Sequence, residues 1–159
     1  MFDKFKYLFI RKELKKYIQE IQHPKKVIRC KVADPVDDKF GIKEVKAKSF
    51  SATLLNFIDT KGITDVDCYK RANIDRKLFS KIRSNNDYRP SKNTVFAFAI
   101  ALKLNLDETQ ELLNSAGYSL SHSFVTDIIV EYFIEKKKFD INLLNMALEE
   151  YNEKPLVSF

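Results

Sequence analysis

Residues 72–102 read ANIDRKLFSKIRSNNDYRPSKNTVFAFAIAL, and this stretch decides the fold. A short turn leads into a segment rich in Arg and Lys, in which apolar residues recur every three or four positions. A polar loop follows, and Ser91 then precedes an almost wholly apolar segment. Because this spacing is that of one helical face and Ser is a favoured N-cap, the stretch predicts two helices, over about 75–84 and 91–103.

Two more helices are predicted immediately upstream. Ser49 can accept a hydrogen bond from a free N–H group at the start of a helix, and Gly62 can end that helix in the left-handed conformation. Thr64, with Asp67 three residues later, is close to a capping box and starts the next helix, which runs through about Ala72. Together with the two helices above, these residues predict four short helices in succession.

Three further helices are predicted downstream, over about 107–116, 124–137 and 141–152. Asp107, three residues before a Gln, is the expected start of the first helix. Ser121 or Ser123 is the expected N-cap of the second, and Asp140 that of the third. Seven short helices joined by short turns predict an all-α fold, a compact bundle of short helices.

The first 24 residues form a separate amphipathic pattern. Apolar residues recur every three or four positions, and Lys and Arg fill the opposite side. The apolar positions are Phe2, Phe5, Phe9, Ile10, Leu14, Tyr17, Ile18 and Ile21. We therefore expect a basic amphipathic helix that Pro24 ends. Three interpretations of this helix stay open: docking on its own domain or, as a homodimer, on a second copy; binding of a protein partner; and lying on a membrane surface.

The segment between this helix and residue 49 alternates loosely between apolar and polar residues around a turn-like ADPVDD. It predicts a linker with short strands, or a short β-hairpin. The chain therefore divides into a basic N-terminal helix, a linker or hairpin, a helical domain and a C-terminal tail, which are residues 1–24, 25–48, 49–153 and 154–159.

The net charge of +6 is distributed unevenly along the 159 residues. Residues 1–48 hold 14 basic and 7 acidic residues, for a net charge of +7. Residues 70–92 hold eight basic and two acidic residues, whereas residues 93–159 hold five basic and ten acidic ones. This asymmetry predicts a cationic face and an acidic far side. Nucleic acid, a membrane surface and an acidic protein are all partners that such a face would attract.

Several function classes are disfavoured. Cys30 and Cys68 form no C-x-x-C pair, so we expect two reduced thiols in a cytoplasmic protein and no metal site. The longest apolar run, 95–102, has eight residues and is too short to cross a membrane. His122 lies among Ser residues, but no carboxylate is placed in the sequence to orient it, and no Gly-rich turn offers an oxyanion or phosphate site. We therefore expect a protein that is not an enzyme and binds no cofactor.

The predicted helices over 64–72 and 75–84 are joined by about three residues, with the apolar Ile74 inside the turn. This is the spacing of a helix-turn-helix, in which the second helix offers its side chains to the major groove of DNA. Its candidate base-reading residues are Arg76, Lys77, Ser80, Lys81, Ser84 and Asn85. The flanking candidates for phosphate contacts are Lys70, Arg71, Arg83, Arg89 and Lys92. An ordinary solvated face or an acidic protein partner would also account for these charges.

Three short motifs lie in residues 63–104, namely ANI (72–74), SKIRSNNDYRPS (80–91) and AIALKL (99–104). They resemble, in order, the Ala-Gly-Val turn, the S-R-I-E-x-G…P-S segment and the A-x-A-L helix end of lambda-repressor-like helix-turn-helix domains, the Cro/repressor or XRE family. The resemblance implies a helix-turn-helix core, duplex DNA as the partner and a role in transcription regulation.

Three residues depart from the pattern of that family. Asp65 stands where the family commonly has a Gln that contacts the DNA backbone, and an acidic side chain there would repel phosphate. Tyr69 stands where a small residue lets the two helices approach, so its ring would widen the crossing or be exposed. Arg83 replaces the usual Glu.

A longer part of the chain, 72–92 with 104–123, is similar to a small helical module of bacterial signalling or conflict proteins. That module often follows another domain, such as an ADP-ribose-binding macro domain. The similarity implies an alternative function, a non-enzymatic protein-interaction or adaptor module in a stress or defence pathway. Asp65 and Tyr69 favour this alternative, whereas the helix-turn-helix spacing and the position of the basic residues favour DNA.

Overall fold

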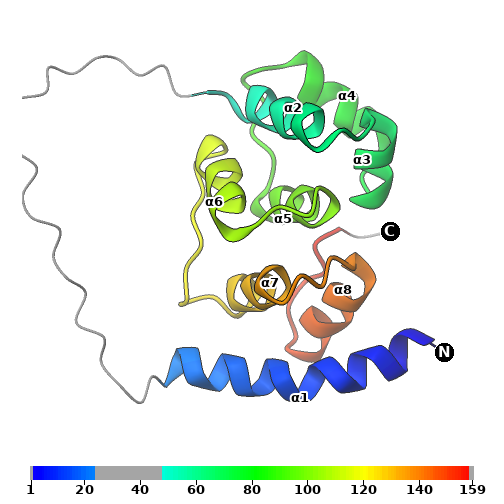
Figure 1. The fold of residues 1–159 in the computed structure, drawn as a ribbon. Coiled ribbons are helices and arrows are strands. Elements are labelled where there is room, and N and C mark those ends of the chain that lie inside the picture. Colours follow the sequence, from blue (N-terminus) through cyan, green and yellow to red (C-terminus); the bar gives the residue numbers. More distant parts are fainter. Residues whose placement is uncertain (1, 24–47, 158–159) are drawn as a thin grey trace, which may run out of the picture.

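The computed structural model describes residues 2–23 and 48–157 (Figure 1). Within these residues the chain is all-helical and contains no strand, which confirms the predicted fold class. The helices are α1 (Phe2–Gln22), α2 (Phe50–Lys61), α3 (Asp65–Arg71), α4 (Arg76–Ser84), α5 (Lys92–Ala101), α6 (Leu106–Ser115), α7 (Val125–Glu135) and α8 (Ile141–Glu150). The predicted linker or hairpin, except for Lys48, lies outside the described residues, as does Cys30.

Local cap chemistry explains where most of the helices begin. The Oγ atom of Ser49 accepts a 3.2 Å hydrogen bond from the backbone N–H three residues on, and Gly62 ends α2 with a φ of 66°. Thr64 caps α3 in the same manner, and Ser91 caps α5. The carboxylate of Asp140 accepts from two backbone N–H groups at the start of α8. These helix starts are confirmed as predicted, because each depends on residues that are adjacent in sequence.

The predicted start of α6 is wrong. Asn105, not Asp107, occupies the N-cap position. The amide oxygen of Asn105 accepts the N–H of Glu108, and the carboxylate of Glu108 accepts the N–H of Asn105, both at 2.9 Å. This reciprocal capping box satisfies two backbone N–H groups at once, so the helix begins earlier than expected.

The start of α7 also differs from the prediction. Phe124 occupies the N-cap position without a side-chain hydrogen bond, so neither Ser121 nor Ser123 caps the helix. Instead, Asp127 in the first turn of α7 accepts a 2.9 Å hydrogen bond from the N–H of Ser121. A buried carboxylate inside the helix thus holds the preceding loop, whereas a hydroxyl ahead of the helix was expected to cap the helix itself.

The helices form successive layers (Figure 1). α2, α3 and α4 lie at one end, α5 and α6 in the middle, and α7 and α8 below them, with α1 across the far end. Every residue from Val95 to Leu102 is buried, and α5 contacts α3, α6 and α8. A helix that is apolar on all sides is stable only when other elements surround it. The most apolar run of the sequence therefore forms the centre of the core.

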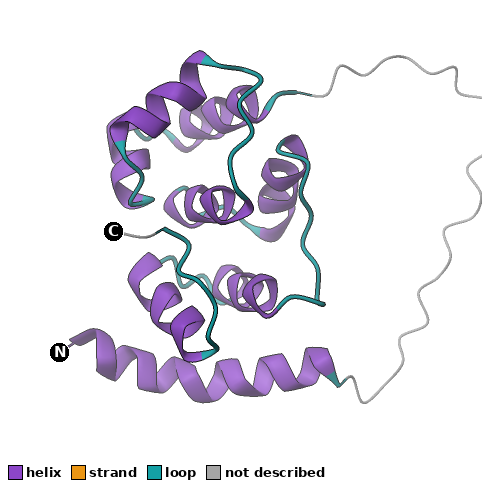
Figure 2. Cartoon of the chain, turned by 180° about the vertical axis from the view of Figure 1, so that it is seen from behind, coloured by secondary structure: helices purple, strands orange, loops and turns teal. Residues whose placement is uncertain are grey.

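α1 packs along α7 and α8 (Figure 2). The side chains buried on its inner side are Tyr7, Ile10, Leu14 and Ile18. Phe5 and Phe9, which the sequence pattern groups with these apolar positions, lie outside the buried stripe and are 72% and 82% exposed. Two apolar stripes overlap in the first turns of α1, and the one that contains Tyr7 continues into the buried residues further along the helix.

Polar contacts fasten α1 to the same two helices. The hydroxyl of Tyr132 on α7 donates a 2.9 Å hydrogen bond to Glu13. Glu150 at the end of α8 accepts from the hydroxyl of Tyr7 and pairs with Arg11, whose Nε lies 2.5 Å from Oε1. Docking of α1 on its own domain, one of the three interpretations open from the sequence, is therefore observed. The basic N-terminal helix and an acidic residue near the C-terminus meet within one chain.

Candidate nucleic-acid interface

The turn between α3 and α4, residues 72–75, has a defined conformation. Ala72 and Ile74 are buried, and the N–H of Ile74 donates a 2.8 Å hydrogen bond to the carbonyl of Tyr69. Asn73 lies between them with a φ of 53°, in the left-handed region. Asn is among the few residues other than Gly that adopt this region readily. Asn73 therefore adopts the left-handed conformation at the position where the Ala-Gly-Val pattern has its Gly.

α4 has a buried face and an exposed basic face. Phe79 and Ile82 are buried, and the ring centroid of Phe79 lies 6.2 Å from that of Phe98 in α5. Because an α-helix has 3.6 residues per turn, the residues on the opposite side recur at spacings of three or four. The exposed side chains there are Arg76, Lys77, Ser80, Lys81 and Ser84, which we call the α4 basic face. Asn85, also exposed, follows directly at the end of the helix.

The cations of the α4 basic face have no acidic partner. Across residues 2–23 and 48–157, no Asp or Glu lies within ion-pair distance of Arg76, Lys77 or Lys81. The same holds for Lys70 and Arg71 in the last turn of α3, both of which are exposed. These five residues therefore keep their positive charge available to an anionic partner.

Two of the three residues that depart from the family pattern, Asp65 and Arg83, form an ion pair with each other. The guanidinium of Arg83 forms an ion pair with the carboxylate of Asp65, which links the end of α4 to the start of α3. The two side chains are 58% and 29% exposed. The acidic residue that was expected to repel phosphate is thus neutralised locally by the Arg that replaces the usual Glu. The same contact occupies Arg83, one of the predicted phosphate partners.

The third departure, Tyr69, packs between the two helices. Its ring is partly buried against the core, and its centroid lies 5.5 Å from that of Phe79 at an interplanar angle of 45°. A tilted aromatic pair at this distance is favourable. α3 and α4 therefore contact each other through two rings at the position where the family pattern has a small residue.

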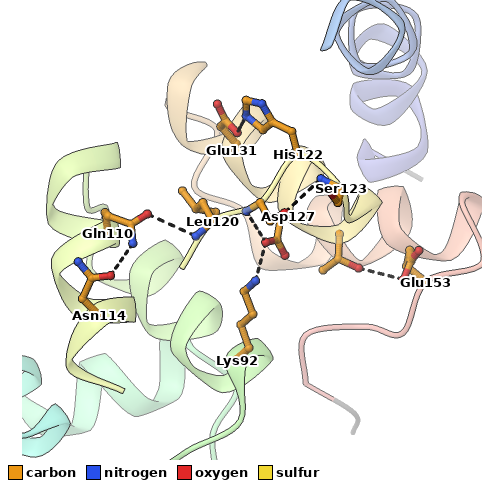
Figure 3. Close-up of polar contacts among 11 residues, drawn as sticks. Lys92, Gln110, Asn114, Leu120, His122, Ser123, Asp127, Glu131 and Glu153 are labelled. Carbon is orange, nitrogen blue, oxygen red and sulfur yellow. Dashed lines mark hydrogen bonds and ion pairs between the residues drawn. The ribbon is translucent and has the colours of Figure 1, made fainter. Parts of the chain in front are cut away.

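Two further candidates for phosphate contacts lie against other parts of the chain: Lys92 in an ion pair, and Arg89, which stays exposed, beside a loop. The Nζ atom of Lys92 lies 2.5 Å from Oδ2 of Asp127, and the two side chains are only 25% and 3% exposed (Figure 3). This ion pair joins α5 to α7. The guanidinium of Arg89 lies against the loop after α6, where a Cβ added to Gly117 would come within 3.1 Å of Nη2. Lys81, by contrast, contacts the loop after α4, with Nζ 5.0 Å from the ring centroid of Tyr88.

The structure reveals a carboxylate partner for His122 that the sequence did not indicate. Nε2 of His122, in the loop before α7, lies 2.6 Å from Oε2 of Glu131, which belongs to the second turn of α7 (Figure 3). The hydroxyl of Ser121 accepts the N–H of Ser123 at 3.2 Å. In the described part of the chain no Ser hydroxyl bonds to the imidazole, whose observed side-chain partner is the carboxylate of Glu131.

Cys68 is fully buried, and burial raises the pKa of its thiol to about 12. It is therefore a neutral core residue at physiological pH. The described residues contain no group of three or more His, Cys, Asp or Glu side chains that could hold a metal ion. No helix among them is long and apolar enough to cross a membrane.

The α4 basic face combines cations with hydroxyl groups, a mixture that can contact phosphate oxygens and base edges. Comparison of the chain with protein-family models, with curated proteins and with solved structures finds no match. The geometry of α3, the turn and α4 is therefore the basis for a proposal about function.

Proposed function

We propose that this chain is a cytoplasmic helix-turn-helix protein that binds duplex DNA and regulates transcription, with α4 in the major groove. The observation that supports this most strongly is the two-sided character of α4. Its apolar side is buried on the core through Phe79 and Ile82, and its exposed side carries cations, without an acidic partner in the described part of the chain, interleaved with hydroxyls. A short helix held in this way presents its outer side chains to a partner without distortion.

The residues have different roles in this proposal. Arg76 and Lys77, in the first turn of α4, contact base edges, because the N-terminal end of a recognition helix enters the groove first. Lys70 and Arg71 in α3 contact phosphates on the adjacent backbone. The remaining base-reading candidates are Ser80, Lys81, Ser84 and Asn85. Arg83, Arg89 and Lys92 have the contacts described above, so they are not assigned to the primary interface.

Fluorescence anisotropy with a mixed-sequence duplex tests the proposal across a range of salt concentrations. If the five cations of α3 and α4 (Lys70, Arg71, Arg76, Lys77 and Lys81) each neutralise about one phosphate charge on docking, the slope of log K against log salt should be roughly −4 to −5, because each neutralised charge releases condensed counterions. Binding without salt dependence would contradict the proposal, since a cationic helix in the major groove must displace these ions.

Two charge-reversed variants make the test specific to α4. The α4 reversal variant replaces Arg76, Lys77 and Lys81 by Glu. The α1 reversal variant makes the same change in net charge on an unrelated exposed surface, at Lys12, Lys15 and Lys16. We expect DNA binding to be lost in the first variant and retained in the second. DNA binding that survives in the α4 reversal variant would rule out this helix as the interface.

The alternative function, a protein-interaction or adaptor module on the same scaffold, has weaker support. The two residues that favoured it from sequence have partners within the chain: Asp65 pairs with Arg83, and Tyr69 packs on Phe79. Homodimerisation through α1 would have to use its outer side, because α7 and α8 cover the inner one. This alternative becomes the preferred function if the full chain shows no salt-dependent DNA binding.

A further inference from the structure

Three of the five exposed large apolar side chains in the described residues lie within one short stretch of α1. Phe5, Leu8 and Phe9 are 72%, 58% and 82% exposed, respectively. The other two, Val66 and Phe124, belong to separate parts of the chain. An isolated exposed apolar residue is ordinary on a protein surface, whereas a cluster marks a contact surface.

The same side of α1 becomes basic further along the helix. Positions 5, 9, 12 and 16 are three or four residues apart, as are positions 8, 12 and 15, so they share one side. We call this side the α1 outer face, and its exposed members are Phe5, Leu8, Phe9, Lys12, Lys15 and Lys16. It lies opposite the stripe that is buried on α7 and α8. α1 can therefore keep its place in the fold while its outer face contacts another surface.

A groove borders the apolar end of the α1 outer face, and its charge is mainly positive. Lys6 and Lys138 line this groove together with the ring of Phe139. The acidic residue that lines it is Asp140, whose carboxylate is occupied by backbone N–H groups of α8 at 3.0 and 3.2 Å. The charge presented around the exposed rings is thus that of lysine, and a complementary partner is anionic.

We propose that the α1 outer face binds the surface of a bilayer that contains anionic lipids. The Phe and Leu side chains enter the interface between headgroups and acyl chains, and the lysines contact the negatively charged headgroups. A fluid bilayer offers the rings an apolar layer that adapts to their shape, directly beside the anionic headgroups that the lysines would contact. α1 lies along the membrane surface in this arrangement, with its inner side still packed on α7 and α8.

The proposal does not depend on DNA binding. α1 and α4 lie at opposite ends of the molecule, with α5 and α7 between them (Figure 1). The same two charge-reversed variants can therefore be used in the DNA-binding test and in the lipid-binding test, and the variant that is the control in one test is the disrupted protein in the other. The α1 reversal variant is expected to lose lipid binding, and the α4 reversal variant is its matched control.

Flotation of the full chain with phospholipid vesicles is the first experiment. We expect recovery with phosphatidylcholine vesicles that contain about one-third phosphatidylserine, little recovery with phosphatidylcholine alone, and release at high salt. The α1 reversal, or replacement of Phe5 and Phe9 by Ser, is expected to lower partitioning about tenfold or more. Equal binding to neutral and anionic vesicles would overturn the proposal, because the lysines would then contribute nothing.

A fluorescent reporter tests insertion directly, since the chain contains no Trp. In a Phe9→Trp variant we expect the emission to shift to shorter wavelength when anionic vesicles are added, because the indole leaves water. Phe124→Trp is the matched control, since Phe124 is 61% exposed on a different part of the surface, and its emission should not change. A shift in both variants would indicate non-specific adsorption, and a shift in neither would mean no insertion; each result overturns the proposal.

Light scattering distinguishes lipid from a second copy of the chain as the occupant. A dimer that the Phe5→Ser and Phe9→Ser changes convert to a monomer, in a protein that does not float with anionic vesicles, would assign the surface to self-association. All the substituted side chains are exposed, so we expect unchanged helicity by circular dichroism. A monomer that floats with anionic vesicles and loses this property in the same variant supports the lipid assignment.

Discussion

Two basic helices lie at opposite ends of the molecule, α4 at one end and α1 at the other (Figure 1). On the α4 basic face, the cations alternate with Ser80 and Ser84, whose hydroxyls donate and accept hydrogen bonds. On the α1 outer face, the lysines adjoin Phe5, Leu8 and Phe9 instead. The two surfaces carry the same kind of charge but differ in the neutral side chains around it.

Positive charge on either surface attracts an anionic partner. The neutral residues around the charge determine which kind of anionic partner binds with the more favourable free energy. Hydroxyls can pair with phosphate oxygens and base edges, so they suit a hydrated, polar ligand. Exposed rings gain free energy when they leave water, so they suit a partner with an apolar layer. The net charge of the chain alone would not have separated these two surfaces.

The largest expected effect comes from the two charge-reversed variants. Reversing the charge on one helix at a time should separate the proposed DNA binding from the proposed lipid binding. The α4 reversal variant should lose about two to three orders of magnitude in DNA affinity near physiological salt, because three phosphate or base contacts are removed. Its vesicle binding should be unchanged. The α1 reversal variant should show the opposite pair of results in the same anisotropy and flotation assays. Loss of both activities in either variant would break the distinction between the two surfaces.

The stability of α1 should depend on its inner side and not on its outer face. Leu14 is completely buried, so Leu14→Ala should lower the free energy of unfolding by about 3 kcal/mol through lost burial and a residual cavity. Leu8→Ala is the matched control, since Leu8 is 58% exposed, and its effect should stay within about 0.5 kcal/mol. Urea denaturation followed by circular dichroism measures both values. Equal losses would mean that the outer face is also packed in solution.

Alkaline pH should weaken the attachment of α1. Burial, together with the neighbouring carboxylates, raises the pKa of Tyr7 (Glu150), Tyr17 (Glu131 and Glu135) and Tyr132 (Glu13). A raised pKa in the folded state means that the folded chain holds these protons more tightly than the unfolded chain. The resulting stability is fully present below about pH 10, the value for an unperturbed Tyr, and is lost as pH rises further.

Thermal unfolding between about pH 8 and about pH 11 measures this dependence, which is a smaller effect than the core substitution. Tyr132→Phe removes one of the three phenols, so its midpoint should fall less steeply with pH than that of the unaltered chain. A steeper fall in the variant would show that the phenols do not control the alkaline response.

The smallest expected effect concerns the ion pair of Asp65 and Arg83. Asp65→Asn removes the carboxylate, so Arg83 becomes available to a phosphate near α4. We expect DNA affinity to rise by about tenfold at most and the salt slope to steepen by about 1. Stability should change by less than about 1 kcal/mol, because both side chains of the pair are partly exposed to solvent. An unchanged slope would mean that Arg83 stays away from the DNA, which would sharpen the boundary of the interface.

Features that depend on neighbouring residues could be predicted from the sequence. The caps Ser49, Thr64, Ser91 and Asp140 act on backbone groups two to four residues away, so the pattern alone contains the necessary information. The separation of α4 into apolar and basic sides follows equally from the helical period. The same approach failed at Asp107, where the competing capping box begins earlier in the chain.

Features that depend on packing could not be predicted. Lys92 and Asp127 are 35 residues apart, and the folded arrangement of the helices brings them together. The first turns of α1 contain two overlapping apolar stripes, and the sequence does not state which one α7 and α8 will cover. Tertiary packing also determines the partners of Arg83 and His122. Asp65 lies on α3 and Arg83 on α4, and Glu131 lies on α7 whereas His122 lies in the loop before it. Predicted site residues such as Arg83 and Lys92 therefore have partners within the chain that the sequence did not indicate.

The docking of α1 has a consequence for how the chain is made. Tyr7 and Glu150 are separated by 143 positions, and Glu13 and Tyr132 by 119. At typical rates of protein synthesis, α1 therefore emerges from the ribosome roughly 10 s before the helices that cover its inner side. During that interval the apolar side chains on both sides of this basic amphipathic helix are exposed to water. The nascent chain can therefore aggregate through a surface that the folded protein buries. Folding helpers that act on the nascent chain would meet α1 before α7 and α8.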